Sequence, residues 1–239
     1  MKSNSAKPKI LAVLHQETSS CGRLGMMLQA MGYEIDPRRP PLGEELPETL
    51  ENHAGVVMFG GPMSANDNEE YVKREIDWIA TPLKEDKPFL GICLGAQMLS
   101  KQLGGSVQSN KDEFVEIGYY PLLPTESGKD LMDWPSMVYQ WHREGFTLPS
   151  GAELLATGHE YENQAMRVGE NAYGVQFHAE LTFAMVYRWT VKGAHRFELN
   201  GAQTRREHIA GRLQHDQQTK LWLDNFLNQW VGPAKQITE

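Results

Sequence analysis

The 239-residue sequence contains only two cysteines, Cys21 and Cys93, and no long run of apolar residues. Two cysteines cannot form a disulfide framework, and the polar N-terminus lacks the apolar stretch of a signal peptide. No window approaches the roughly 20 apolar residues that span a membrane. We therefore expect a cytoplasmic protein that has reduced thiols and makes no contact with a membrane.

Dense clusters of basic residues are also absent. The chain has 23 Lys and Arg residues against 31 Asp and Glu residues, which gives a formal net charge of −8. Nucleic-acid phosphates bind to clustered cations, so this charge pattern argues against a nucleic-acid partner. We expect a small-molecule substrate instead.

The hydrophobic residues, 40% of the chain, are enough for a core. Short apolar runs at 10–14, 56–59 and 89–92 predict strands that are buried on both faces. Helices are predicted between these strands, because apolar residues recur there at helical spacing. These residues are Leu24, Met27, Leu28 and Met31 in the first helix and Val72, Ile76, Ile79 and Leu83 in the second. Segment 37–51, rich in Pro and acidic residues, is interpreted as a connection. The alternation indicates an α/β fold with a central, mostly parallel sheet flanked by helices.

The rest of the chain has a different pattern. Residues 107–165 hold short alternating runs that predict a small antiparallel region. A last strand with Tyr173, Val175 and Phe177 should end at His178. After Leu181 the pattern becomes helical, with apolar positions at Leu213, Leu221, Leu223, Phe226, Leu227 and Trp230. The apolar end of this segment, Leu221 to Trp230, should pack on the domain or into a homodimer.

Three histidines in this last region, His195, His208 and His215, match no usual metal-ligand spacing and are interpreted as solvated. Nothing in the sequence resembles a flexible linker between domains. We therefore expect a single domain over residues 1–239, with a core at about 9–181 and a helical C-terminal extension at about 182–232.

Residues 89–97 have the pattern of a nucleophile elbow. An apolar strand leads into Gly91-Ile92-Cys93-Leu94-Gly95, and a helix should begin near Leu94. The two glycines permit a sharp, strained turn that presents the Cys93 thiol where the helix dipole favours a thiolate. The amide of Leu94 would point to the position at which an oxyanion forms. The alternative is that Cys93 is a small buried apolar residue beside glycines that permit close packing.

Two more features lie at the ends of predicted strands. If the last strand continued, His178 and Glu180 would leave the same face, so that the carboxylate could orient the imidazole. The loop Gly60-Gly61-Pro62 follows the strand at 56–59 and exposes backbone N–H groups to an oxyanion. Taken separately, the pair could be a solvated strand end and the loop a tight turn. Together with Cys93, they indicate a site at the carboxyl edge of a parallel sheet.

This set of motifs resembles the class I, triad-type glutamine amidotransferases. The family's Gly-x-Cys-x-Gly-x-Gln elbow is matched by Gly91, Cys93, Gly95 and Gln97, its His-x-Glu ending by His178 and Glu180, and its oxyanion loop by Gly60 to Pro62. Within the family, these residues are similar to the amidotransferase domain of GMP synthases. The resemblance covers about residues 9–181 and implies a flavodoxin-like fold.

The resemblance also implies roles for individual residues. Cys93 would be the nucleophile, His178 the general base and acid, and Glu180 the residue that orients His178. The amides of Gly60 and Leu94 would form the oxyanion hole, and substrate-binding positions are implied at Gln97, Gly61, Trp141 and Arg143. Such a site converts the γ-amide of glutamine to glutamate and ammonia through a γ-glutamyl thioester, and calls for no metal or organic cofactor.

Three functions remain open from the sequence. Ammonia is useful only to a synthase, yet the chain has no Gly-Lys-Ser/Thr phosphate-binding loop and no room for a second catalytic domain. A glutamine-hydrolysing chain would therefore need a separate ammonia-accepting synthetase subunit. Alternatively, the protein acts alone on γ-glutamyl peptides or amides as a hydrolase. The third possibility is a non-catalytic regulatory or binding module that keeps the fold.

Overall fold

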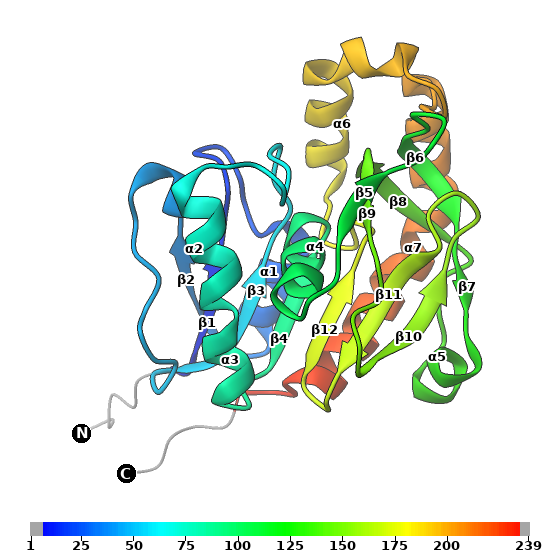
Figure 1. Cartoon of the computed structure of the whole chain (residues 1–239). Coiled ribbons are helices and arrows are strands. Elements are labelled where there is room, and N and C mark those ends of the chain that lie inside the picture. The colour runs from blue at the N-terminus through cyan, green and yellow to red at the C-terminus, as the bar shows by residue number, and fades with distance from the viewer. Residues whose placement is uncertain (1–6, 235–239) are drawn as a thin grey trace.

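The structure, a computed structural model, describes residues 7–234 and is built around an eight-stranded sheet (Figure 1). The strand order is β2-β1-β3-β4-β12-β11-β10-β7. The first five strands in this order are parallel to one another, and the last three are antiparallel to their neighbours. Their bounds are Glu34–Arg38 (β2), Lys9–Val13 (β1), His53–Met58 (β3), Phe89–Ile92 (β4), Ala172–Val175 (β12), Asn163–Val168 (β11), Ala152–Thr157 (β10) and Leu123–Pro124 (β7). The prediction of a mostly parallel central sheet is confirmed.

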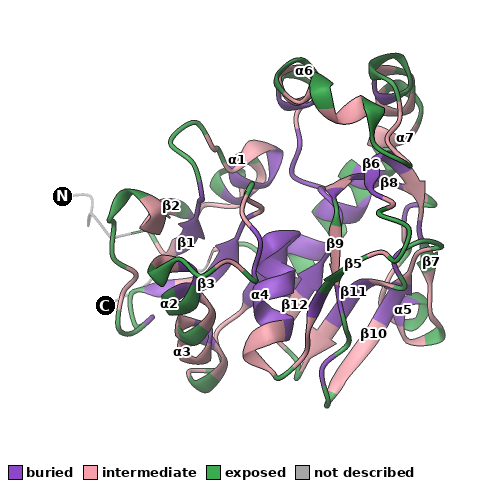
Figure 2. Ribbon diagram, turned by 45° about the horizontal axis from the view of Figure 1, so that its top comes forward, coloured by how far each residue is buried: buried purple, intermediate pink, exposed green. Residues whose placement is uncertain are grey.

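Helices cover both faces of this sheet. On one face, α1 (Gly22–Ala30) and α7 (Arg205–Trp230) pack against strand residues such as Ile10 and Ile92. On the other face, α2 (Glu70–Trp78), α3 (Ala80–Lys84) and α4 (Leu94–Gln102) pack against residues such as Leu11 and Val56. Figure 2 shows that α4, which follows β4 directly, is buried at the centre of the molecule. The Cys93 motif at the start of α4 therefore lies in the middle of the sheet edge.

Two small antiparallel pairs lie beside the main sheet. They are β5 (Val107–Ser109) with β9 (Glu144–Phe146), and β6 (Glu116–Pro121) with β8 (Met137–His142). The short helix α5 (Glu126–Leu131) lies between β7 and β8 in the chain. The antiparallel region expected at 107–165 is therefore present, and it extends through β11 to Val168.

An arch of helices stands above these pairs (Figure 1). It is formed by α6 (Phe183–Lys192), the 3-10 helix η2 (Ala194–Glu198) and the first turns of α7. Met185 and Val186 of α6 pack on Tyr119 and Tyr139 of the β6–β8 pair. The arch is thereby fixed over the carboxyl edge of the parallel strands.

Two local predictions were wrong. Residues 34–38 form β2, so the predicted connection 37–51 begins inside a strand; only its later part is irregular, apart from η1 (Pro40–Leu42). This strand lies at the edge of the sheet and pairs with β1 alone, which explains why it tolerates Pro37 and polar residues. The helix predicted through Leu83 is divided at Ile79 into α2 and α3.

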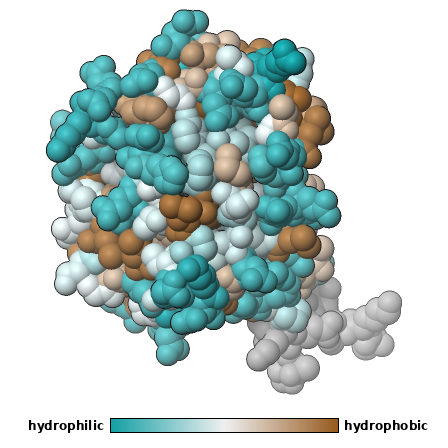
Figure 3. Space-filling view, turned by 90° about the vertical axis from the view of Figure 1, so that its right-hand side faces the viewer, coloured by the Kyte–Doolittle hydropathy of each residue, from teal (hydrophilic) through white to brown (hydrophobic). Residues whose placement is uncertain are grey.

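The last helix, α7, supplies much of the core on its sheet face. Leu223, Phe226, Leu227 and Trp230 are buried there, which confirms that these predicted apolar positions pack on the domain. Leu221, in contrast, does not pack on the domain, because it is 57% exposed, and the apolar position Leu213 is 81% exposed. Figure 3 shows the side of the molecule that carries α7 and β7, where apolar areas are small and separated by hydrophilic atoms. The homodimer stays a prediction.

The prediction that His208 is solvated was wrong, because the residue is buried. Its Nε2 donates to the carbonyl oxygen of Gln203 at 3.1 Å, and its Nδ1 accepts from the hydroxyl of Tyr139 at 2.8 Å. Burial lowers the pKa of His208 to about 4, so the ring is neutral at pH 7. His195 is exposed and His215 partly exposed. None of the helices within residues 7–234 is long and apolar enough to cross a membrane.

Candidate active site

Cys93 lies at the junction of β4 and α4 in a strained backbone conformation. Its φ of 52° and ψ of −104° are rare for a residue with a side chain. The flanking glycines are required by close contacts. A Cβ at Gly91 would lie 2.5 Å from the carbonyl carbon of Gly95, and a Cβ at Gly95 would lie 2.1 Å from the carbonyl oxygen of Met58. The turn therefore has the geometry of a nucleophile elbow, with the thiol at the start of a helix.

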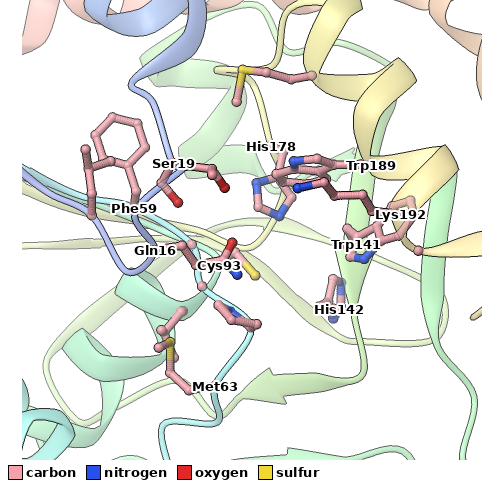
Figure 4. Close-up of a pocket in the computed structure, with 18 of the residues that line it drawn as sticks. Gln16, Ser19, Phe59, Met63, Cys93, Trp141, His142, His178, Trp189 and Lys192 are labelled. Atoms are coloured by element: carbon pink, nitrogen blue, oxygen red, sulfur yellow. The ribbon is translucent and has the colours of Figure 1, made fainter. Parts of the chain in front are cut away.

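His178 lies close to Cys93 (Figure 4), and Glu180 holds its ring. Nδ1 of His178 is 2.8 Å from Oε1 of Glu180, and both side chains are almost fully buried. Burial opposes a charged imidazole, but the charges and hydrogen bonds of Glu180 and Cys93 outweigh it. They raise the pKa of His178 from 6.5 to about 10. The geometry lets the imidazole exchange protons with the thiol while Glu180 keeps the ring in place.

The turn that carries Glu180 is clamped by two helices. The prediction that the last strand ends at His178 was wrong: β12 ends at Val175, so no strand continues through His178 and Glu180. Instead, the Glu180 carbonyl accepts from the Arg23 amide at 2.7 Å, at the start of α1. The next carbonyl, of Leu181, accepts from the Arg23 Nε at 2.9 Å and from Arg212 of α7 at 2.8 Å. The paired carboxylate thus depends on tertiary contacts and not on strand periodicity.

The Gly60-Gly61 loop faces the same point. A Cβ at Gly60 would lie 2.9 Å from Cε1 of His178 and 3.4 Å from Cβ of Cys93, so only glycine fits between them. Within the part of the chain that the structure describes, the amides of Gly60 and Leu94 have no hydrogen-bond acceptor. Two unused donors beside the thiol are suited to a developing oxyanion.

A buried pair that the sequence analysis did not identify supports this loop. Nδ1 of His15 lies 3.2 Å from the carbonyl oxygen of Gly60. Since a carbonyl oxygen can only accept, Nδ1 is the donor of this hydrogen bond. Nε2 of His15 is 2.8 Å from Oε2 of Glu75, and both side chains are almost completely buried. Gly61 is needed for this packing, since a Cβ there would lie 2.8 Å from Cβ of His15. No sequence motif links His15 to Glu75, which lie 60 positions apart.

The remaining predicted residues complete the pocket. Nε2 of Gln97 donates to the Glu144 carbonyl at 2.7 Å and to Oε1 of Gln176 at 3.3 Å, which fixes Gln97 against the β8–β9 turn. Trp141 lies in β8, and Arg143 lies in the turn after it. All nine site residues that the sequence singled out line one pocket of about 290 Å³.

A model of the family "Glutamine amidotransferase class-I" matches residues 24–184, which is more than half of the chain. The protein belongs to the class I glutamine amidotransferase family. The chain is 30% identical over 184 residues to the glutamine amidotransferase-like protein YfeJ of Salmonella typhimurium, a match that covers 73% of this chain and 76% of YfeJ. A glutamine amidotransferase of Thermotoga maritima has a similar structure, with a TM-score of 0.85, 33% identity, and coverage of 95% of this chain and 99% of that one.

Other relatives of this chain are named as synthases. It is 30% identical over 151 residues to one subunit of a GMP synthase of Sulfurisphaera tokodaii, in a match that covers 62% of this chain and 74% of that relative. It is also 32% identical over 140 residues to a GMP synthase of Porphyromonas gingivalis, in a match that covers 57% of this chain. That match covers 27% of the P. gingivalis protein, so the amidotransferase spans about a quarter of this relative's length.

One wall of the amidotransferase pocket was not expected from any motif. It comes from α6 and η2, inside the segment described above as a helical extension. The Trp189 ring packs edge-on against His178 with centroids 5.0 Å apart, and it also contacts Trp141 at 5.7 Å. Figure 4 shows Trp141, Trp189 and Lys192 gathered on one side of His178. The C-terminal segment therefore takes part in the site as well as in the core.

Proposed function

We propose that this amidotransferase hydrolyses a γ-glutamyl amide, with glutamine as the simplest substrate. The observation that carries the proposal is the convergence of Cys93, His178 and Gly60 on one point of the pocket. The strained elbow presents the thiol, Glu180 orients the imidazole, and two unused amides lie beside the thiol. A silent binding module would not require this combination of strain, a buried charged pair and unused donors.

The first chemical step is attack of the Cys93 sulfur on the δ-carbonyl carbon of the substrate. The thiol proton passes to Nε2 of His178, and the negative charge on the carbonyl oxygen is met by the amides of Gly60 and Leu94. His178 then gives its proton to the leaving nitrogen, the C–N bond breaks, and a γ-glutamyl thioester remains on Cys93. The raised pKa of His178 keeps this proton available at neutral pH.

Water then hydrolyses the thioester. His178 takes a proton from water, the hydroxide oxygen attacks the same carbonyl carbon, and the proton returns to sulfur as the C–S bond breaks. Glutamate is released, together with ammonia if glutamine was the substrate. No step requires a metal or an organic cofactor. Glu180 holds the ring in one orientation throughout.

Binding of the glutamyl part is assigned to the pocket residues around Gln97. Gln97, Gly61, Trp141 and Arg143 all line the pocket, and Gln97 is held in place through its bond to the Glu144 carbonyl. A separate synthetase subunit that uses the ammonia is the natural partner if glutamine is hydrolysed best. Two relatives support this possibility, because one is named as a GMP synthase and the other as a component of one.

The proposal is tested by measuring glutamate release from glutamine and from γ-glutamyl dipeptides by the purified chain. We expect turnover by the wild type that falls at least a thousandfold in Cys93→Ala and in His178→Ala. Cys21→Ala is the matched control, because Cys21 is the other cysteine and lines no part of the pocket. Equal rates for wild type and Cys93→Ala would refute the proposal.

A further inference from the structure

The pocket wall that the motifs did not predict is strongly basic. Its charged residues are Arg143 in the β8–β9 turn, Arg188 and Lys192 on α6, and Arg196 in η2. Within residues 7–234, none of these four makes an ion pair closer than 4.0 Å. Two acidic residues are found among the described lining residues: Glu180, which is bonded to His178, and Glu144. This wall therefore carries an excess of positive charge in a chain whose net charge is −8.

Fold stability does not explain this arrangement. Arg188 and Lys192 are four positions apart on one helix, a spacing at which like charges destabilise the helix. Burial lowers the pKa of Arg196, and the nearby charge of Arg143 lowers it further. Lys192 lies in the last turn of α6, where a cation interacts favourably with the helix dipole. That interaction would explain Lys192 alone, and not the cations that other elements bring to the same wall. Uncompensated cations that converge on a pocket from three elements are suited to binding an anion.

The direction of the reaction places one end of the substrate at this wall. The leaving nitrogen must face His178, since His178 protonates it. Any substituent on that nitrogen then extends past His178, away from the Gly60 loop. That is the side on which Trp189, Trp141 and Lys192 lie (Figure 4). Glutamine has no substituent on this nitrogen and would therefore leave this part of the pocket empty.

We propose that the substrate of this amidotransferase is a γ-glutamyl amide whose amine part carries an anionic oxygen group, a carboxylate or a phosphate, bound by Arg143, Arg188, Lys192 and Arg196. The inference rests on the proposed hydrolysis and names its substrate class. The two tryptophans form the sides of the passage, and the cations bind the anion at its far end. Arginine pairs with either group through two parallel hydrogen bonds, so both sources share one chemistry.

Binding to Cys93→Ala separates recognition from chemistry. We would measure the Kd by calorimetry for γ-glutamylglycine, γ-glutamylphosphoethanolamine and the neutral γ-glutamylglycinamide at low ionic strength. At least one of the two anionic compounds should bind about tenfold or more tightly than the amide, and added salt should reduce the difference. The tighter of the two identifies carboxylate or phosphate as the preferred group. Equal Kd values for all three compounds would overturn the proposal and leave the cations to another role, such as contact with a protein partner.

Variants locate the effect. For each variant we would compare the Kd of γ-glutamylglycinamide with that of the anionic compound that binds more tightly. Arg188→Gln with Lys192→Met should bring the ratio of these two Kd values toward one. Lys220 is an exposed cation on α7 outside the pocket, so Lys220→Met should leave the ratio unchanged. If the double variant does not fold, Arg143→Gln, in an exposed turn, provides the same test. An unchanged ratio in Arg143→Gln and in any folded double variant would contradict the assignment.

The two proposals can fail separately. If the wild type hydrolyses γ-glutamylglycine and γ-glutamylglycinamide with equal kcat/KM, and neither anion binds more tightly, the hydrolysis stands and the substrate class is wrong. If the anionic compounds bind more tightly but no compound is hydrolysed, the anion site stands and the proposed reaction is wrong.

Discussion

The buried pair of His15 and Glu75 should control the oxyanion hole without acting on the substrate itself. His15 donates to the carbonyl of Gly60, and Glu75 holds the other nitrogen of the ring. The amide and the carbonyl of Gly60 belong to one residue, so loss of the carbonyl contact frees the amide to turn from the oxyanion. We would replace both residues, His15→Leu with Glu75→Leu, because replacing one alone with an apolar residue would leave a buried polar group without its partner.

The expected effect on kcat follows from the contact that is lost. Removal of a whole oxyanion donor typically costs 10²- to 10³-fold, and here the donor is misdirected but still present. We therefore expect kcat to fall by about tenfold to hundredfold, or about 1.4 to 2.7 kcal/mol. Stability should change little, since two apolar side chains replace a buried polar pair.

Two assays separate this role from general damage. Glutamate release should slow, while the rate of Cys93 alkylation by iodoacetamide should stay within about twofold of wild type, because alkylation creates no oxyanion. Glu75→Gln alone keeps the shape of the side chain and a hydrogen bond to His15. Its kcat should therefore stay close to the wild-type value, unlike that of the double leucine variant. If alkylation and turnover fell together, or if turnover did not fall, the assigned role of the pair would be refuted.

Three further changes test how the site and the arch are held. Glu180→Gln removes the charge that raises the pKa of His178. The alkaline limb of the pH profile of kcat/KM should therefore shift to lower pH by about one to three pH units. A profile that does not shift would show that another group sets this limb. Gly22→Ala would place a Cβ 2.1 Å from the Glu180 carbonyl oxygen, on a backbone with φ of 55°. The Tm and the rate of glutamate release should both decrease. A variant with wild-type values of both would contradict the role of α1 in holding the turn that carries Glu180. Burial keeps His208 neutral down to a pKa of about 4, whereas the unfolded chain takes up this proton below pH 6.5. The free energy of unfolding should therefore decrease between pH 6.5 and 4, by about 3 kcal/mol at most, and urea titrations of His208→Gln should show a flatter dependence over this range.

The parts of the site that could be predicted from the sequence are those encoded by short motifs. The elbow at Cys93 depends on neighbours two positions away, because sharp turns require small residues at fixed spacing. The parallel sheet was also predictable, since strands buried on both faces form continuous apolar runs. His178 and Glu180 were paired correctly, although for a wrong reason: a turn clamped by α1 and α7 brings them together, and no strand continues through them.

The parts that could not be predicted depend on contacts between distant segments. The edge strand β2 has only one neighbour, so its polar residues and Pro37 carry no strand signal. His15 follows β1 and Glu75 lies in α2, 60 positions apart in the sequence, so only the folded chain brings the two side chains together. The basic residues of α6 have the spacing of an ordinary solvated helix face, and only the arch shows that they line the pocket.

The most direct test of the γ-glutamyl thioester is to let hydroxylamine compete with water for it. We would measure γ-glutamyl hydroxamate and glutamate formed from glutamine and from γ-glutamylglycine at one hydroxylamine concentration. If both substrates pass through the same thioester on Cys93, the ratio of hydroxamate to glutamate should be identical for the two, and Cys93→Ala should form neither product. Ratios that differ between the two substrates, or product formation that survives in Cys93→Ala, would contradict the account.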